Sequence, residues 1–102
     1  EKETPVFYLK GSVNGWSDND DYKLAIDGDT ATLTVELEAN AEFKIATSNW
    51  NPEFGWGKLV DQTNGMLGDN GGNIKVLTAG VYTFVVTDLN GTPVWTVTAE
   101  AK

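Results

Sequence analysis

Three tryptophans lie in predicted turns or loops, and they are the residues of this chain best suited to ligand chemistry. Trp16 follows a turn at residues 11–15, Trp50 follows a predicted strand, and Trp56 lies in a glycine-rich stretch. A sugar has a flat face of C–H bonds that packs on an indole, and its hydroxyls need partners such as Asn and Lys. One loop aromatic alone could equally be a lid over the end of the fold. Three beside Asn and Lys predict a site for a neutral glycan.

Other chemistries are excluded by the residues that the chain lacks. It has no histidine and no cysteine, which removes Ser-His-Asp and Cys-His catalysis, thiolate chemistry, disulfides and the usual zinc, copper and iron sites. The 15 carboxylates allow an acid pair of the glycosidase type in number, but nearly all lie in predicted turns or on outward strand positions. The sequence therefore predicts no catalytic residues, no cofactor and a protein that is not an enzyme.

Two acidic turns, at residues 18–21 and 27–29, carry oxygen atoms of the kind that calcium binds. The EF-hand spacing is absent, because Tyr22 interrupts the first turn and no glycine or terminal glutamate falls at the required positions. Acidic turns are mostly exposed to water. We therefore expect no metal site.

The balance of charge limits the partners. The chain has 15 acidic and 7 basic residues, the latter all lysines, and a formal net charge of −8. Binding to nucleic acid or to an anionic membrane surface needs a positive footprint that this chain lacks. No apolar run approaches the ~20 residues that span a bilayer. The expected partner is therefore neither a nucleic acid nor a membrane.

Apolar residues recur with a period of two, which is typical of strands with one buried face. Leu33, Val35 and Leu37 alternate with polar residues, and β-branched residues dominate this run and the others. Trp95 has the inward phase of its run, and valines on the second face of 81–86 predict that this strand is covered on both faces. The candidate strands are 6–13, 22–26, 32–37, 42–47, 73–77, 81–86 and 95–99.

Breaker residues separate these runs, and Asp27-Gly28 and Asn90-Gly91 are hairpin signals. No window has the period of a helix. About seven to eight short strands at regular spacing predict an all-β fold, an antiparallel immunoglobulin-like β-sandwich. The length predicts one domain over residues 1–102, with linker-like ends at 1–5 and 100–102.

Residues 48–72 interrupt the strand pattern. The segment is rich in Gly, Asn and Trp and shows no clear alternation. A loop of this length in a small domain is usually functional or disordered, and its two tryptophans argue against disorder. We therefore expect a long loop that contributes to the site.

Four short motifs resemble, in their order and spacing, those of starch-binding β-sandwich modules. They are Gly11-Ser12-Val13-Asn14-Gly15-Trp16, Phe43-Lys44-Ile45-Ala46-Thr47-Ser48-Asn49-Trp50, Gly72-Asn73-Ile74-Lys75-Val76 and Gly80-Val81-Tyr82-Thr83-Phe84. The likeness runs from about Val6 to Val97 and is greatest to the repeated modules of bacterial starch-binding outer-membrane lipoproteins of the SusE and SusF type. Modules attached to amylases and pullulanases are similar. The glycogen-binding domain of the AMP-activated kinase is a more distant analogue.

The resemblance implies how a ligand would be held. In such modules two aromatic rings form a curved platform for an α-1,4-glucan, while a lysine and an asparagine bond the glucose hydroxyls. By motif position the rings are Trp16 and Trp50, and the polar partners are Lys44 and Asn73. Lys44 has the outward phase of its strand, which agrees with this role.

The sequence departs from this pattern after Trp50, where Trp56 and Lys58 add a third indole and a second lysine. Trp56 could replace Trp16 in the platform, which would leave Trp16 as a packing residue. The candidate site residues, in order of preference, are Trp50, then Trp56 and Trp16, then Lys44, Asn73 and Lys58.

The function implied by the resemblance is non-catalytic binding of α-1,4-glucans: starch, maltooligosaccharides or glycogen-like polymers. The chain would be one module of a larger multidomain protein that is extracellular or on a bacterial cell surface. Two alternatives stay open. One is a structural or protein-interaction sandwich of a larger surface protein, and the other is a module for a different neutral glycan, such as xylan or a β-glucan. The segment 48–72 favours glucan binding, because a spacer has no need of two indoles in a long loop.

Overall fold

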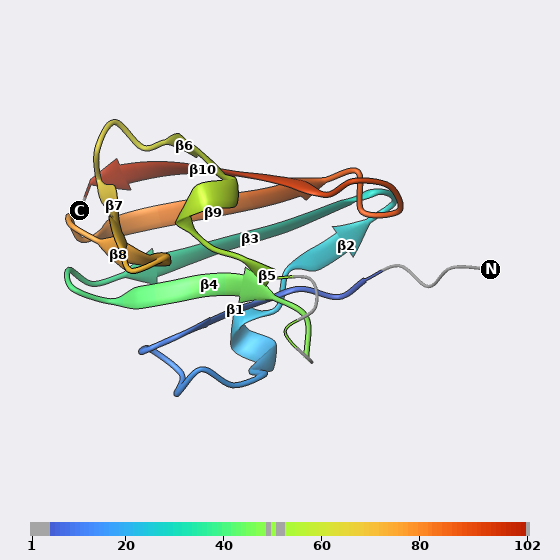
Figure 1. The fold of residues 1–102 in the computed structure, drawn as a ribbon, viewed down its shortest axis with the longest axis horizontal. Helices are drawn as coiled ribbons and strands as arrows, with labels where there is room; N and C mark the ends of the chain where they lie inside the picture. The colour runs from blue at the N-terminus through green and yellow to red at the C-terminus, as the bar shows by residue number, and fades with distance from the viewer. Residues whose placement is uncertain (1–4, 49, 51–52, 102) are drawn as a thin grey trace.

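Two sheets pack face to face (Figure 1). The computed structural model describes residues 5–48, 50 and 53–101. Sheet A has the strand order β1-β4-β8-β7 with β5 beside β4, and sheet B has the order β2-β3-β9-β10-β6. The strands of sheet A are β1 (Tyr8–Gly11), β4 (Glu42–Ala46), β5 (Glu53–Phe54), β7 (Leu67–Asn70) and β8 (Asn73–Val76). The strands of sheet B are β2 (Ala25–Asp27), β3 (Thr30–Leu37), β6 (Leu59–Gln62), β9 (Gly80–Thr87) and β10 (Val94–Ala101).

Two short 3-10 helices complete the described secondary structure. They are η1 (Asp20–Tyr22), which follows β1, and η2 (Trp56–Lys58), which lies between β5 and β6. Within the described part of the chain, no helix has the length and apolar character needed to cross a membrane.

Alternation along the strands builds the core between the sheets. Phe43 of β4 meets Phe84 of β9 with ring centroids 5.4 Å apart, and Phe84 contacts Trp95 of β10 at 5.8 Å. All three rings are buried, so the inward position predicted for Trp95 is confirmed. Because successive side chains of a strand point to opposite faces, Lys44 beside Phe43 points away from the core.

The predicted all-β sandwich is confirmed, with more strands than the seven to eight expected. The described residues contain ten, and β5, β6 and β7 fall in residues 48–72, where the sequence predicted a long loop. β5 has two residues, and the four residues of β6 and of β7 do not alternate between buried and exposed, so none of the three has the hydrophobic period of a strand. Most strand pairs are antiparallel as predicted, but β6 pairs with β10 in parallel.

Both hairpin signals are confirmed. Gly28 has a φ of +65° in the turn that joins β2 to the antiparallel β3. Between β9 and β10, Asp88 has a φ of +57°, and its carboxylate accepts a hydrogen bond from the Thr92 N–H at 3.0 Å. Aspartate tolerates this left-handed backbone better than most residues because its short side chain bonds nearby backbone groups.

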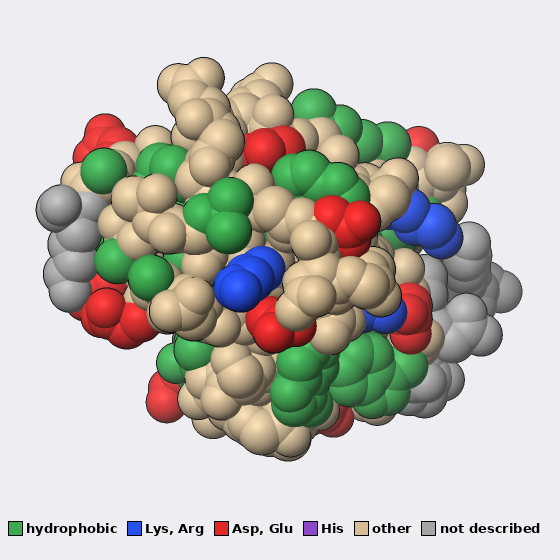
Figure 2. Space-filling view, turned by 60° about the vertical axis from the view of Figure 1, so that its left-hand side comes forward, with side chains coloured by type: hydrophobic (Ala, Val, Ile, Leu, Met, Phe, Trp, Pro, Cys, Tyr) green, Lys and Arg blue, Asp and Glu red, His purple; other side chains and the backbone are tan. Residues whose placement is uncertain are grey.

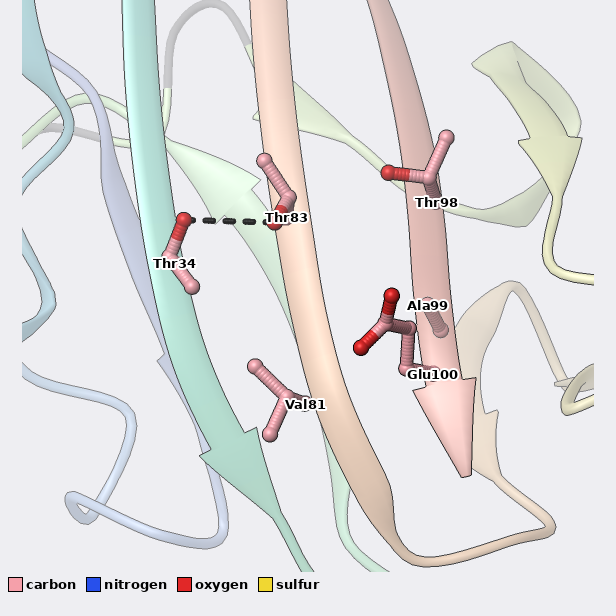
Figure 3. A pocket seen from close by; sticks show the side chains of 6 residues that line it. All are labelled: Thr34, Val81, Thr83, Thr98, Ala99 and Glu100. Carbon is pink, nitrogen blue, oxygen red and sulfur yellow. Dashed lines mark hydrogen bonds between the residues drawn. The ribbon is translucent and has the colours of Figure 1, made fainter. Parts of the chain in front are cut away.

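The outer face of sheet B is open, so the prediction that strand 81–86 is covered on both faces is wrong. Val81 of this strand is 40% exposed. The pleated surface favours β-branched residues whether or not they are covered, which explains the misleading valines. A shallow depression on this face is lined by Thr34, Val81, Thr83, Thr98, Ala99 and Glu100 (Figure 3).

Candidate functional site

Trp16 and Trp50 lie side by side and are called here the tryptophan pair. Their ring centroids are 6.4 Å apart and their planes are tilted by 30°. Trp16 belongs to the connection between β1 and η1, and Trp50 to the connection between β4 and β5; both connections lie along the lower edge of the molecule in Figure 1. Both residues are half-buried. Two of the three candidate tryptophans therefore form one aromatic surface.

Both members of the pair have a left-handed backbone, which bulky side chains rarely adopt. The φ angle is +62° at Trp16 and +64° at Trp50. The other described non-glycine residues with positive φ are two asparagines and one aspartate, which tolerate this region. For other L-residues the conformation costs about 1–2 kcal/mol. Because strained backbone concentrates at ligand sites, these two outliers distinguish the pair from the remaining aromatics.

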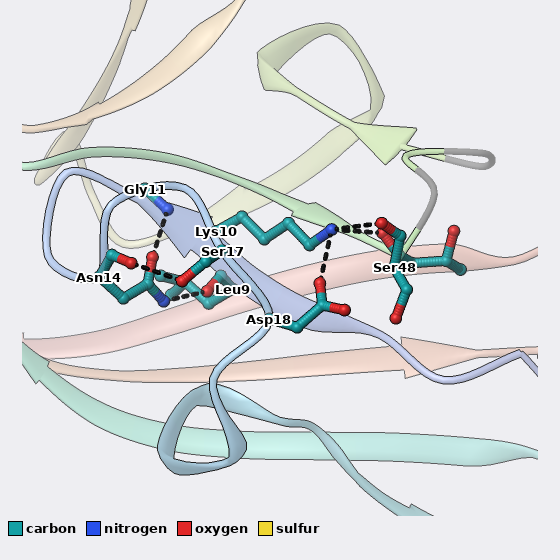
Figure 4. Close-up of polar contacts among 8 residues, drawn as sticks. Leu9, Lys10, Gly11, Asn14, Ser17, Asp18 and Ser48 are labelled. Carbon is teal, nitrogen blue, oxygen red and sulfur yellow. Dashed lines mark hydrogen bonds and ion pairs between the residues drawn. The ribbon is translucent and has the colours of Figure 1, made fainter.

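The segment 11–16 holds Trp16 against β1, the edge strand of sheet A. The Gly11 N–H donates to Asn14 Oδ1 at 3.1 Å, and Asn14 Nδ2 donates to the Leu9 carbonyl at 2.8 Å (Figure 4). The Trp16 N–H donates to the Gly11 carbonyl at 2.9 Å. A Cβ on Gly11 would collide with the backbone oxygen of Glu42. The glycine and asparagine of this motif therefore have a structural role, which places the indole that follows them.

A buried lysine joins the two connections that carry the pair. Lys10 of β1 is 1% exposed, and its ammonium donates to the carbonyl oxygens of Thr47 at 2.7 Å and Ser48 at 3.1 Å. The same ammonium forms an ion pair with Asp18 at 2.8 Å (Figure 4). It also lies 4.4 Å from the ring centroid of Trp50, within the range of a cation–π interaction. Lys10 is thus in contact with both sides of the site.

The carboxylate of Asp18 is held in its ionised form. A hydrogen bond with Lys10, and a second with Ser48, lower the pKa of Asp18 below its ordinary value of 3.8. In the same turn, Asn19 accepts a hydrogen bond from the Asp21 N–H at 2.9 Å and caps η1. The described residues include no group of three or more His, Cys, Asp or Glu side chains that could hold a metal ion.

Lys44 and Asn73 face outward from neighbouring strands of sheet A. Lys44 lies opposite Lys10 in the register of β1 and β4. Its ammonium is 2.9 Å from Glu53 Oε1, and its side chain is 24% exposed. Asn73 Nδ2 donates to Glu42 Oε1 at 3.4 Å. The structure therefore places both predicted polar residues on the outer face of the sheet, each bonded to a carboxylate.

Trp56 and Lys58, the remaining candidates, belong to η2. The Trp56 N–H donates to the Gly72 carbonyl at 3.0 Å, and the indole is partly buried against the core. Lys58 is exposed, with its ammonium 5.9 Å from the Phe54 ring centroid. Within the described residues, no ring contact joins Trp56 to the tryptophan pair. The structure thus pairs Trp50 with Trp16.

Two surface features of the described residues can be compared as ligand sites, the tryptophan pair and the depression on sheet B. Figure 2 shows one face on which hydrophobic side chains gather along the lower edge, next to acidic and basic ones. The depression on sheet B differs in chemistry, because none of its lining residues is aromatic or basic. Only the tryptophan pair, among the features described above, supplies two flat apolar faces with donors on the adjoining sheet face.

The family of the chain follows from its sequence. The model of the SusF/SusE starch-specific carbohydrate-binding modules matches residues 6–94. The chain belongs to this family. The resemblance seen in the four motifs is therefore confirmed. No curated protein sequence matches this SusF/SusE module.

A solved structure supports the same fold. The SusF/SusE module is similar to the crystal structure of SusF from Bacteroides thetaiotaomicron, with a TM-score of 0.69 and 24% sequence identity. The similarity covers 98% of this chain but 25% of the SusF chain, so the module spans about a quarter of the length of that neighbour.

Sequence reasoning did not identify Lys10 or Asp18 as part of the site. Lys10 has the outward phase of a predicted strand, and a lysine there is usually in water. Asp18 belongs to an acidic turn that suggested only solvation or calcium. The one available signal was position, since Lys10 directly precedes the motif that ends at Trp16.

Proposed function

We propose that this SusF/SusE module binds α-1,4-glucan without catalysing a reaction, and that glucose units pack on the tryptophan pair. The observation that carries the proposal is the tilt of 30° between two rings 6.4 Å apart. An α-1,4-glucan turns along its length, so its successive sugar faces suit tilted rings, whereas a flatter chain suits coplanar ones. The family description, starch-specific carbohydrate-binding modules, supports the same ligand.

Lys44 and Asn73 are the proposed hydrogen-bonding partners of the glucose hydroxyls. An ammonium has three donors, and Lys44 directs one of them to Glu53 while 24% of its side chain remains exposed. Asn73 can accept through its amide oxygen while its nitrogen bonds Glu42. Trp56 and Lys58 are proposed as a flanking surface, because η2 directly follows the strand that contains Glu53.

The proposal that the module is not an enzyme rests on its titratable groups. The chain has no histidine and no cysteine. Asp18, the carboxylate beside the pair, has a lowered pKa and is already bonded to Lys10, so it is poorly suited to donate a proton to a glycosidic oxygen. A binding role needs no such group.

The context of the module is also a proposal. Because SusF is much longer than this chain, we place residues 1–102 as one module of a larger multidomain protein, with a linker-like end at 1–5. At the other end, the linker predicted at 100–102 is not borne out for its first two residues, because Glu100 and Ala101 belong to β10 and pair with Val81 and Gly80 of β9. An extracellular or bacterial cell-surface location fits a polysaccharide ligand that is too large to enter a cell.

Affinity electrophoresis in native gels tests the proposed function. The module is run in gels that contain amylopectin, glycogen, xylan or a β-glucan, with Trp50→Ala as the matched variant. We expect amylopectin and glycogen to retard the wild type, and no polysaccharide to retard the variant. The ligand is neutral, so moderate salt should leave the retardation unchanged.

Other results point to the alternatives. If no polysaccharide retards the wild type, a structural or protein-interaction domain becomes the better description. Retardation by xylan or by the β-glucan, and not by the α-glucans, would identify a module for a different neutral glycan. Release of reducing sugar from any of these polymers would contradict the non-catalytic assignment.

A further inference from the structure

We propose that Lys10 is a positioning residue that sets the spacing and tilt of the tryptophan pair; its effect on ligand binding rests on the proposed function of that pair. The two indoles come from separate connections, so sheet A alone does not fix one relative to the other. Lys10 contacts both connections through a single ammonium. Its ammonium can therefore hold them in one arrangement, together with the hydrogen bond between Asp18 and Ser48.

The Trp50 side of this arrangement depends on two backbone bonds. The Thr47 and Ser48 carbonyls accept from Lys10 Nζ at 2.7 Å and 3.1 Å. The Trp50 N–H in turn donates to the Thr47 carbonyl at 3.0 Å, which closes a turn at the end of β4. The ammonium then lies 4.4 Å from the indole centroid of Trp50. One cation thus contacts both the turn and the ring that the turn presents.

The Trp16 side depends on Asp18. This carboxylate lies two residues after Trp16 and bonds the same ammonium at 2.8 Å. At the other end of the segment, Asn14 and the Trp16 N–H hold it to the edge of β1. Trp16 therefore lies between two anchors, and loss of Asp18 or Lys10 would free one of them.

Lys10 acts on the ligand through the indoles and not by contact. Its ammonium has three donors, and the two carbonyl oxygens and the carboxylate use all three. The side chain is also 1% exposed. Lys44, directly opposite in the register, has the reverse character, with 24% exposure and one carboxylate partner. Two lysines at equivalent places in adjacent strands thus have different roles.

The strained backbone at both tryptophans explains why a restraint is needed there. Both tryptophans have a positive φ. This backbone conformation is unfavourable for a bulky residue, so an unrestrained chain would relax to a negative φ. Charge-assisted hydrogen bonds are among the strongest in proteins. A buried ammonium with three of them can oppose the relaxation of both backbones at once.

The test compares Lys10→Met with Lys75→Met in the whole module. Methionine keeps the apolar stem of Lys10, and the partners left behind lie at a surface that water reaches, because Ser48 is exposed and Asp18 is 43% exposed. Lys75 is a half-buried lysine on the outer face of the same sheet, which makes it the matched control. Two coupled indoles give an exciton couplet in the far-ultraviolet circular dichroism spectrum, and its loss in Trp16→Phe assigns the couplet to this pair.

We expect Lys10→Met to be folded, as a cooperative unfolding transition would show, and to lose most of the couplet without any ligand present. Its affinity for maltoheptaose should be roughly tenfold or more weaker, as the loss of a charge-assisted bond predicts. Lys75→Met should keep the couplet and the affinity. A folded Lys10→Met with an unchanged couplet overturns the proposal, and a lost couplet with unchanged affinity overturns the link to binding.

A second variant protects the test against misfolding. If Lys10→Met does not fold, Asp18→Ala tests the proposal instead. This substitution removes one partner of the Lys10 ammonium, and it lies at an exposed position. A smaller couplet in Asp18→Ala supports the proposal, and an unchanged one overturns it. If the wild type binds no α-glucan, the proposed function fails, while the ligand-free couplet still tests the role of Lys10.

Discussion

The Lys44 ammonium lies 2.9 Å from Glu53 Oε1, across the short pairing of β4 with β5. Both side chains are partly exposed, at 24% and 43%. An ion pair of this kind contributes little to stability, typically about 0–1 kcal/mol, because water screens it. The ion pair instead orients the Lys44 side chain: the Glu53 carboxylate holds the ammonium along the outer face of sheet A. The donors of the ammonium that Glu53 does not use are then available to the hydroxyls of a bound sugar.

Lys44→Ala should weaken α-glucan binding less than Trp50→Ala does. A hydrogen bond from a charged group to a neutral hydroxyl contributes about 1.5–3 kcal/mol at most, whereas Trp50 supplies half of the apolar surface of the pair. Isothermal titration calorimetry of both variants gives the order directly. An equal or larger loss for Lys44→Ala would mean that the lysine, and not the indole, dominates binding.

Trp50→Gly should bind no better than Trp50→Ala but should be the more stable of the two. Residue 50 has a φ of +64°, where a Cβ costs about 1–2 kcal/mol and glycine has no such cost. We therefore expect Trp50→Gly to exceed Trp50→Ala by about 1 kcal/mol in free energy of unfolding. Chemical denaturation of the two proteins measures the difference. Equal stabilities would indicate that the backbone relaxes once the indole is removed.

Trp56→Ala should affect stability more than ligand binding. The Trp56 indole is partly buried against the core, and loss of a half-buried aromatic ring typically costs about 2 kcal/mol. Thermal unfolding should show a lower midpoint, while calorimetry at a temperature where the variant is folded should show nearly unchanged affinity for maltotriose. A folded variant with greatly reduced affinity would move Trp56 from the flank into the centre of the platform.

Asp18→Asn should lower the free energy of unfolding at neutral pH, and this loss should become smaller in acid. The folded state lowers the pKa of Asp18 below 3.8, so its carboxylate stabilises the fold above that pH and loses this effect as the pH falls through the lowered value. The difference in free energy of unfolding between wild type and variant should be full at pH 7 and should vanish in strong acid. A difference that is constant over this range would contradict the Lys10–Asp18 contact.

Affinity should rise with ligand length over a few glucose units and then level off. Two stacking rings contact at least two neighbouring sugars, and each aromatic contact adds about 0.5–1.5 kcal/mol beyond burial. We expect dissociation constants of roughly 10 μM to 1 mM for short maltooligosaccharides. A cyclic glucan that is already curved, such as β-cyclodextrin, should bind at least as well because it loses less freedom. Continued gain well beyond maltoheptaose would require an extended groove.

The long strands could be predicted from the sequence because each has one buried face. Leu33 and Val35 of β3, and Trp95 and Val97 of β10, mark their strands by alternation alone. The strands β5, β6 and β7 could not be predicted this way, since their backbone bonds to neighbours define them and their side chains show no period. The alternation of side chains along one segment does not show which distant segment it will pair with.

The sequence predicted some of the residues that the structure brings together at the candidate site. The chemistry of sugars drew attention to Trp16 and Trp50, and the structure places them together. The sequence could not predict which of two outward lysines, Lys10 and Lys44, is buried. Both have the same phase in adjacent strands, yet the loops that cover Lys10 leave Lys44 in contact with water. Burial by a loop depends on where the loop folds, which strand periodicity does not encode.

The position of β10 has a consequence for how the module is made. It is the last described strand along the chain, yet it lies inside sheet B, between β9 and β6. Until residues 94–101 leave the ribosome, β9 keeps an open edge, and the core lacks Trp95 and Val97. Folding should therefore be a late event that waits for β10. The hairpin of β9 and β10 is local, but the parallel pairing of β10 with β6 joins segments far apart in the sequence, which is the slow kind of pairing. In a protein with several such modules in tandem, the waiting edge could accept β10 of a neighbour, so strand exchange between modules is the expected misfolding route.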